Sequence, residues 1–241
     1  MGTGRANSHL TEFMMKTVKT TDISENRQYY RNQLIAAFRY SRLFSEPLGK
    51  VAETVVDTPE FEAILQECAQ GSFECARRAA EMAVVYLDRP GQGMSPAAWW
   101  RDLLNYERGC FLQSATAAPT PPSNRPRRGV SAVCMNFSWK MPELAARLQA
   151  GMAPGEDLRG PVTLLFCRTR EGRTQIVEVG AAIERVFRAT NGLRTVEQIT
   201  SAAGTTGEAT VQALEALADI GAVVPAMTAE EMTRLIEARK E

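Results

Sequence analysis

The chain has 241 residues, and its 28 lysine and arginine residues balance 28 aspartate and glutamate residues, so the formal net charge is zero. This balance removes a general electrostatic attraction to nucleic acid and leaves only local basic patches to be considered. No apolar run approaches the roughly 20 residues that a membrane-spanning helix needs. The first 26 residues lack the basic and then apolar pattern of a secretory signal. We therefore expect a cytoplasmic protein.

The histidine count restricts the chemistry further, because His9 is the single histidine of the chain. Iron sites with two histidines and zinc sites with two histidines cannot be built from this chain alone. A Ser-His-Asp or Cys-His arrangement would depend on that one residue. The five cysteines are scattered, which indicates reduced thiols. The composition thus favours a binding or partner subunit without a cofactor over a self-sufficient enzyme.

The first half of the chain has a helical pattern. Residues 1–24 show no period, and we expect a disordered lead-in. Residues 25–116 carry apolar residues at helical spacing, which predicts an α-helical bundle. The last helical segment has two apolar stripes, as is typical of a helix packed between partners. One stripe contains Trp99, Leu103, Tyr106 and Cys110, and the other contains Trp100, Leu104, Glu107 and Phe111.

Residues 117–128 (AAPTPPSNRPRR) contain four prolines and three arginines, and they predict an extended linker between two domains. After the linker the period changes. We expect a strand over residues 130–137, a short helix over 142–150 and a hairpin with strands at 162–169 and 175–179.

Capping signals then predict three helices and a C-terminal one. The first helix ends at Asn191-Gly192, and capping boxes beginning at Thr195 and Thr205 open the next two. Thr228 opens a final amphipathic helix over residues 228–241. The expected fold is α+β, with the helical bundle followed by a winged-helix-like domain over residues 129–227 that has a small antiparallel sheet and three helices.

A winged helix suggests a DNA-binding regulator, but the charges argue against it. Residues 204–221, which include the third helix, contain Glu208, Glu215 and Asp219 and no lysine or arginine. An acidic helix is repelled by DNA phosphates. Arg168, Arg170 and Arg173 cluster on the hairpin, where they are either a solvated turn or a surface that attracts an acidic leader peptide. DNA regulation is kept as an alternative.

The second hairpin strand and the third helix can instead form a peptide-binding groove. A strand at the edge of a sheet accepts a further strand, and the helix over residues 208–220 would supply the other wall. The alternative is that these residues only pack the small core, which is the favoured reading for Leu214 and Leu217. The expected peptide-binding residues are Arg168, Arg173, Gln175, Ile176, Val177, Glu178, Val179, Val211, Leu214, Glu215 and Ala218.

Residues 162–224 resemble the PqqD-like peptide-recognition elements of ribosomal peptide modification systems. The shared pattern is a hairpin, a helix ending in NG, the motif RTVEQI and a helix ending in IGAVV. Together with the helix around WRDLLNYER, the proline-rich linker and the strand ending in FSWKMPEL, residues 29–224 are similar to the small partner proteins of multinuclear non-haem iron oxygenases. The TglI-like and MbnC-like partners fit best, and the TglI-like family is favoured.

The resemblance implies a subunit that binds a precursor peptide and docks, as a heterodimer, on a TIM-barrel oxygenase that holds the iron. In a TglI-like system, a carrier peptide ends in an added cysteine from which a TglH-like oxygenase excises one carbon, on a 3-thiaglutamate-type pathway. An MbnC-like system instead forms an oxazolone and a thioamide. The expected oxygenase interface is the helical domain, with Trp99, Trp100, Tyr106, Glu107 and Arg108. The alternative is that these residues pack or hydrogen-bond within the domain.

Overall fold

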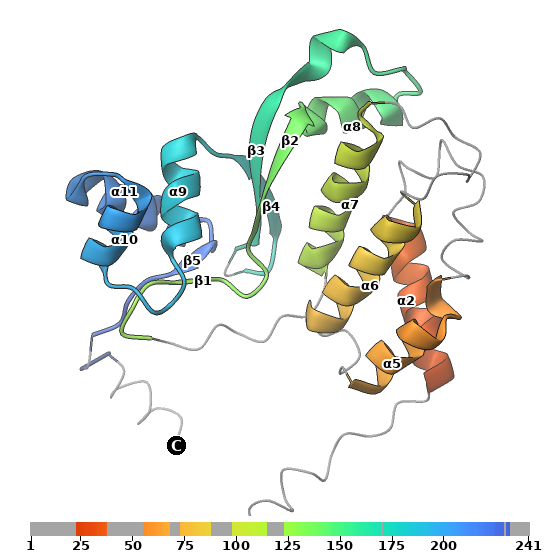
Figure 1. Cartoon of the computed structure of the whole chain (residues 1–241), viewed down its shortest axis with the longest axis horizontal. Coiled ribbons are helices and arrows are strands. Elements are labelled where there is room, and N and C mark those ends of the chain that lie inside the picture. The colour runs from red at the N-terminus through yellow and green to blue at the C-terminus, as the bar shows by residue number, and fades with distance from the viewer. Residues whose placement is uncertain are drawn as a thin grey trace, which may run out of the picture.

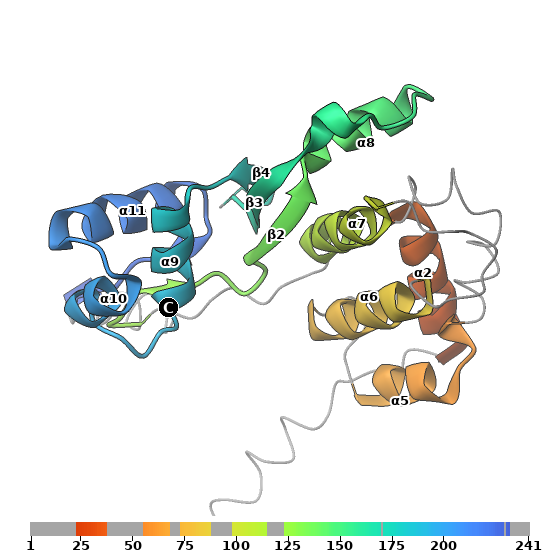
Figure 2. The same ribbon diagram turned by 45° about the horizontal axis from the view of Figure 1, so that its top comes forward.

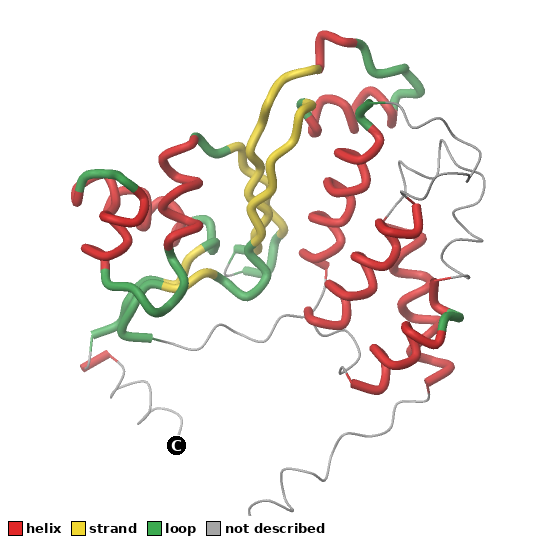
Figure 3. The backbone as a smooth tube through the Cα atoms, in the orientation of Figure 1, coloured by secondary structure: helices red, strands yellow, loops and turns green. Residues whose placement is uncertain are grey.

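The structure is a computed structural model, and it describes residues 23–37, 55–67, 73–87, 98–114, 123–169, 171–228 and 230–231. The fold is mixed α+β, which confirms the predicted class (Figure 1). The described helices before residue 117 lie on one side of a small antiparallel sheet and the helices within residues 181–219 lie on the other side, and this remains visible in the turned view (Figure 2). Figure 3 shows the strands between the two groups of helices.

The described helices of the first half pack through the apolar faces that the sequence pattern indicated. They are α2 (Ile23–Ala37), α5 (Pro59–Glu67), α6 (Phe73–Leu87) and α7 (Trp100–Ser114). Helix α5 begins after Thr58, whose hydroxyl accepts a hydrogen bond from the Phe61 amide at 3.2 Å, and Pro59 occupies the first turn. The ring of Tyr30 on α2 meets Phe61 edge-on, with the ring centroids 5.9 Å apart.

The main sheet has three antiparallel strands in the order β2 (Val133–Trp139), β3 (Arg159–Arg168) and β4 (Thr174–Glu178). Helix α8 (Met141–Gln149) and the short helix η1 (Glu156–Leu158) connect β2 to β3. The antiparallel pairing of β3 with β4 confirms the predicted hairpin. The strand expected over residues 130–137 lies at Val133–Trp139 instead. It begins later because a turn precedes it, in which the Ala132 amide donates to the Gly129 carbonyl at 3.0 Å.

Three helices follow the hairpin, as predicted: α9 (Ala181–Ala189), α10 (Val196–Ala203) and α11 (Gly207–Asp219). A second small sheet pairs β1 (Arg127–Arg128) with β5 (Val223–Val224). Most of the expected C-terminal helix, beyond residue 231, lies outside the described residues. Its predicted start is present, because Thr228 and Glu231 exchange the two hydrogen bonds of a capping box.

The residues that cap α10 and α11 can be compared one by one with the predicted caps. The predicted capping box at Thr195 is present at the start of α10. The cap predicted at Thr205 is wrong by one residue, since the Thr206 hydroxyl accepts the hydrogen bond from the Ala209 amide at 3.2 Å. Thr205 uses its hydroxyl differently, in a 2.7 Å hydrogen bond with the hydroxyl of the buried Thr210.

Strand β3 separates two hydrophobic cores, because side chains on both of its faces are buried. Leu164 and Phe166 belong to the core that contains the described helices of the first half, together with β2 and α8. Leu165 and Cys167 face the opposite way and pack with α9, α10 and α11. The first core therefore contains residues from before and after the expected linker. The sheet packs on the described helices before the linker with one face and on α9, α10 and α11 with the other.

Two contacts hold α7 close to the sheet. A Cβ on Gly109 would lie 2.7 Å from carbons of the Phe166 ring, so the glycine permits an approach that a larger residue would prevent. In the first turn of α7, the Asp102 carboxylate accepts a hydrogen bond from the Ser138 amide of β2 at 2.6 Å. Burial raises the pKa of Asp102, and the backbone amides of Ser138 and Trp139 oppose that rise.

Candidate functional site

Strand β4 has an open edge. Among the described residues it pairs only with β3. The hydrogen bonds from the Val179 amide to the Thr163 carbonyl and from the Thr169 amide to the Arg173 carbonyl, both 2.9 Å, fix the phase of the ladder. In an antiparallel ladder, every second residue directs its amide and carbonyl away from the partner strand. The residues that do so on β4 are Thr174, Ile176 and Glu178.

Helix α11 lies on one side of this edge, where its end approaches the start of β4. Its Thr210, Ala213 and Leu217 are buried in the second core. The residues that directly follow these buried ones form a neighbouring face of the helix that is only partly covered. Val211 on this face is 44% exposed. That face carries Val211, Leu214, Glu215 and Ala218.

The end of α11 is fixed against β3 by a tight turn. Gly221 has a φ of +78°, and the amides of Gly221 and Ala222 donate to the carbonyls of Ala218 and Leu217. This is the hydrogen-bond pattern of a Schellman motif, which favours glycine at that position. The Cys167 thiol on β3 donates to the Ile220 carbonyl at 3.3 Å, so the same turn is held to the strand next to β4.

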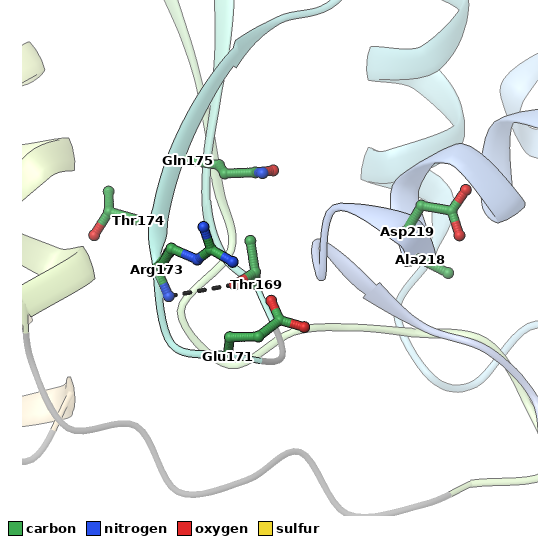
Figure 4. Close-up of a pocket in the computed structure, with 7 residues that line it drawn as sticks. All are labelled: Thr169, Glu171, Arg173, Thr174, Gln175, Ala218 and Asp219. Carbon is green, nitrogen blue, oxygen red and sulfur yellow. Dashed lines mark hydrogen bonds between the residues drawn. The ribbon is translucent and has the colours of Figure 1, made fainter.

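A cavity of about 450 Å³ lies between the hairpin and α11 (Figure 4). The hairpin contributes most of its lining, and the last turn of α11 contributes the rest. The lining residues are Thr169, Glu171, Arg173, Thr174, Gln175, Ala218 and Asp219. The cavity therefore lies where a strand added to β4 would pass the helix.

Gln175 is the most informative residue of this cavity. It pairs with Cys167 of β3, so its side chain shares the face of the sheet that packs on α11. Figure 4 shows the side-chain amide of Gln175 pointing across the cavity toward α11. Its Oε1 atom is buried and has no hydrogen-bond partner. A buried acceptor without a donor costs free energy, which a ligand that supplies a donor would recover.

The structure brings together only part of the predicted peptide-binding set. Arg173, Gln175 and Ala218 line the cavity. Arg168 lies on the other face of the hairpin, and its Nε and Nη2 both donate to the Gly172 carbonyl at 3.1 Å. Arg170 lies outside the described residues. Val211, Leu214 and Glu215 lie on α11 beyond the cavity.

The remaining predicted residues, three on β4 and Val179 directly after it, divide between the two faces of the sheet. Ile176 packs against the first core and Val177 against the second core, while Glu178 is exposed and Val179 is buried. Sequence reasoning missed four of the cavity residues, which are Thr169, Glu171, Thr174 and Asp219. Their positions were the available signal. They lie at the hairpin turn and at the end of α11, the two elements that the sequence predicts as walls of the groove.

The predicted partner interface is largely internal. Trp100, Tyr106 and Glu107 are buried in the chain itself, and Glu107 is only 1% exposed and interacts with another group of the chain. The Tyr106 ring meets Phe137 and Phe166 edge-on. The half-buried residues of the set are Trp99 and Arg108, and the Nε of Arg108 is buried without a hydrogen-bond partner.

Other features of the described residues add no second site. Within these ranges, no group of three or more histidine, cysteine, aspartate or glutamate side chains is placed to hold a metal ion. None of the helices that the structure describes is long and apolar enough to cross a membrane. Comparison with models of known protein families and with curated proteins finds no match.

Proposed function

We propose that the chain is a non-catalytic subunit that binds a ribosomally made precursor or carrier peptide as an added strand on β4. One observation carries this proposal. Thr174, Ile176 and Glu178 direct their amides and carbonyls outward from β4, and the start of this edge, at Thr174 and Gln175, lines a cavity whose far wall is the end of α11. Strand addition uses such main-chain groups for affinity and neighbouring pockets for specificity.

The finer fold assignment belongs to the same proposal. The hairpin with α9, α10 and α11 would form a winged-helix-like, PqqD-like recognition domain, and the helices before residue 117 would form a helical domain that packs on the other face of the same sheet. The order of elements and the groove between β4 and α11 support this assignment.

The partner would be a TIM-barrel, iron-dependent oxygenase in the cytoplasm, with this chain holding no cofactor. The support is the resemblance over residues 29–224 to the TglI-like partner proteins. In that case the chain presents the C-terminal cysteine of a carrier peptide for carbon excision, in a 3-thiaglutamate-type pathway. Trp99, directly before α7, and Arg108 on α7 are then the expected contact residues, while the buried Trp100, Tyr106 and Glu107 would fix the position of that helix.

Two alternatives give different outcomes in the same experiments. An MbnC-like partner would serve oxazolone and thioamide formation and would bind a different peptide. A winged-helix DNA regulator would require a helix that tolerates phosphates, and α11 carries Glu208, Glu215 and Asp219 without any lysine or arginine. No contact of the described residues favours DNA binding.

The proposal is tested by co-expression of the full chain with the products of its neighbouring genes, followed by iron analysis of each purified species. We expect a one-to-one complex with an iron-containing barrel protein, and an isolated chain without iron. Binding of the precursor peptide should be at least roughly tenfold weaker in the Glu178→Pro variant, which removes one outward amide of β4, and unchanged in Glu178→Ala. Purification of the chain with DNA, or peptide binding unaffected by Glu178→Pro, would overturn the proposal.

A further inference from the structure

The cavity beside β4 is rich in hydrogen-bond acceptors. The buried Oε1 of Gln175 has no donor. The carboxylate of Asp219 belongs to the same lining, at the C-terminal end of α11. The C-terminal end of a helix carries partial negative charge and favours cations. The Gln175 Oε1 atom, the Asp219 carboxylate and the end of α11 thus all favour a ligand with a hydrogen-bond donor or a positive charge.

The described arginines of the hairpin, Arg168 and Arg173, do not outweigh the acceptors of the cavity. Arg168 is directed to the Gly172 carbonyl on the opposite face of the hairpin, so it is not part of the cavity. Arg173 is the one basic residue of the described lining, and it is exposed at the turn. Glu171 lines the cavity from the same turn. Among the described residues of the hairpin, the cavity therefore has one arginine, Arg173, and one carboxylate, Glu171, rather than a wall of arginines that would suit an acidic leader peptide.

Strand geometry places a peptide side chain over this cavity. A strand added to β4 would lie about 4.8 Å outside it, and its side chains would alternate between the two faces of the sheet. Those on the face of Gln175 would point toward α11, where the small side chain of Ala218 leaves room. A lysine or arginine at that position would enter the cavity that Gln175 and Asp219 both line.

We infer that the groove between β4 and α11 recognises a basic side chain, lysine or arginine, of the bound peptide, with Gln175 and Asp219 as the residues that determine this specificity. The inference rests on the proposed function, because it assumes that a peptide strand occupies β4. It reverses the sequence-based expectation of an acidic leader. It also predicts that Arg173→Ala strengthens the binding of a basic peptide, since the substitution removes a like charge from the lining.

The first experiment selects binders from a displayed library of random 12-residue peptides on the immobilised full chain. We expect enriched peptides that share a lysine or arginine at one position. Failure to enrich any peptide would count against the proposed function itself. Enrichment of peptides with a neutral or acidic residue at that position would leave strand binding in place and overturn the charge specificity.

The second experiment measures the affinity of a selected peptide and of its lysine-to-norleucine analogue by fluorescence anisotropy. We expect the analogue to bind roughly tenfold more weakly, as for loss of a hydrogen bond to a charged group. This ratio should approach one in Asp219→Asn and in Gln175→Leu, and it should be unchanged in the matched control Glu143→Gln, an exposed carboxylate of α8. A ratio that stays the same in both groove variants would overturn the assignment of Gln175 and Asp219.

Discussion

Gly221 lies so close to the carbonyl oxygen of Arg168 that a Cβ on Gly221 would overlap that oxygen. The contact joins the turn after α11 to the last residue of β3, and β3 is the strand that carries β4. The spacing between the two walls of the proposed groove thus depends on a glycine that does not line the cavity.

We predict that Gly221→Ala destabilises the protein more than Gly204→Ala. Both glycines have positive φ, +78° and +61°, so each alanine incurs a conformational cost of about 1 kcal/mol. Only Gly221 has a backbone atom in the space that a Cβ would occupy, whereas nothing lies within 4 Å of one on Gly204. Urea unfolding of the two variants measures the difference. Equal losses of stability would show that the contact with Arg168 has no energetic role.

The edge of β4 gives a second prediction. Glu178 is exposed and directs its amide away from β3, so Glu178→Pro should leave the sheet intact and cost less than about 1 kcal/mol of stability. The same change removes a donor from the edge and should weaken peptide binding at least roughly tenfold. Circular dichroism and titration with a selected peptide separate the two effects. Glu178→Ala, which keeps the amide, is the control.

A third prediction concerns the acid stability of the contact between α9 and the sheet. The Arg188 guanidinium, whose Nε donates to Glu184 at 2.9 Å, lowers the pKa of Glu184, and hydrogen bonds from Asn136 and Thr163 lower it further. Because the folded pKa lies below the ordinary value of 4.5, the carboxylate stabilises the fold above that pH, and this contribution is lost as the pH falls through the folded pKa.

Replacing Glu184 with glutamine should therefore reduce stability by roughly 0.5–1 kcal/mol at pH 7 and have little effect at pH 2. Denaturant unfolding across this pH range provides the measurement. The same substitution at the exposed Glu143, which pairs with no arginine among the described residues but lies in the first turn of α8, should have a smaller effect. A constant difference between Glu184→Gln and wild type at all pH values would contradict the assignment to the ionised carboxylate.

The cysteines give a fourth prediction. Burial raises the pKa of Cys134 and of Cys167 to about 11, from an ordinary value of 9.0. Two pKa units lower the thiolate fraction near neutral pH about 100-fold, and the thiolate is the reactive form. Iodoacetamide at pH 8, followed by mass spectrometry, should label these two positions far more slowly in the folded chain than in urea. Equal labelling rates in the two states would contradict the prediction.

Local signals were enough to predict the order of elements after the linker. The glycine turn of the hairpin and the capping box at Thr195 are encoded by neighbouring residues, and both are present. The sequence favours Thr205 as the cap of α11, because Glu208 follows it by three residues as in a capping box. In the structure Thr206 caps the helix, and the Thr205 hydroxyl bonds to Thr210 instead.

The packing of the sheet on both groups of helices was harder to predict. The apolar run of β3 contains Leu164, Leu165, Phe166 and Cys167 in succession, which is the pattern of a strand buried on both faces. The same run predicts one strand of the hairpin, and its burial on both faces goes beyond that expectation. As a result, Tyr106 and Glu107 were expected at a partner interface, although Tyr106 packs on the Phe166 face of the sheet.

The candidate site was predictable as a strand and a helix but not as a set of side chains. The strand period places Gln175 on the face toward α11, yet no local signal reveals that its Oε1 lacks a donor. The direction of Arg168 follows from its register with Thr174, which is known only once the hairpin turn is fixed.

Residue-resolved amide hydrogen exchange, with and without a selected peptide, tests the central claim most directly. The amides of Thr174, Ile176 and Glu178 face outward in the free chain, and strand addition would bond them to the peptide. We predict that exchange at these three amides slows on peptide binding, while Gln175 and Val177, already bonded to β3, change little. Unchanged exchange at the three outward amides in a peptide-saturated sample would contradict strand addition on β4.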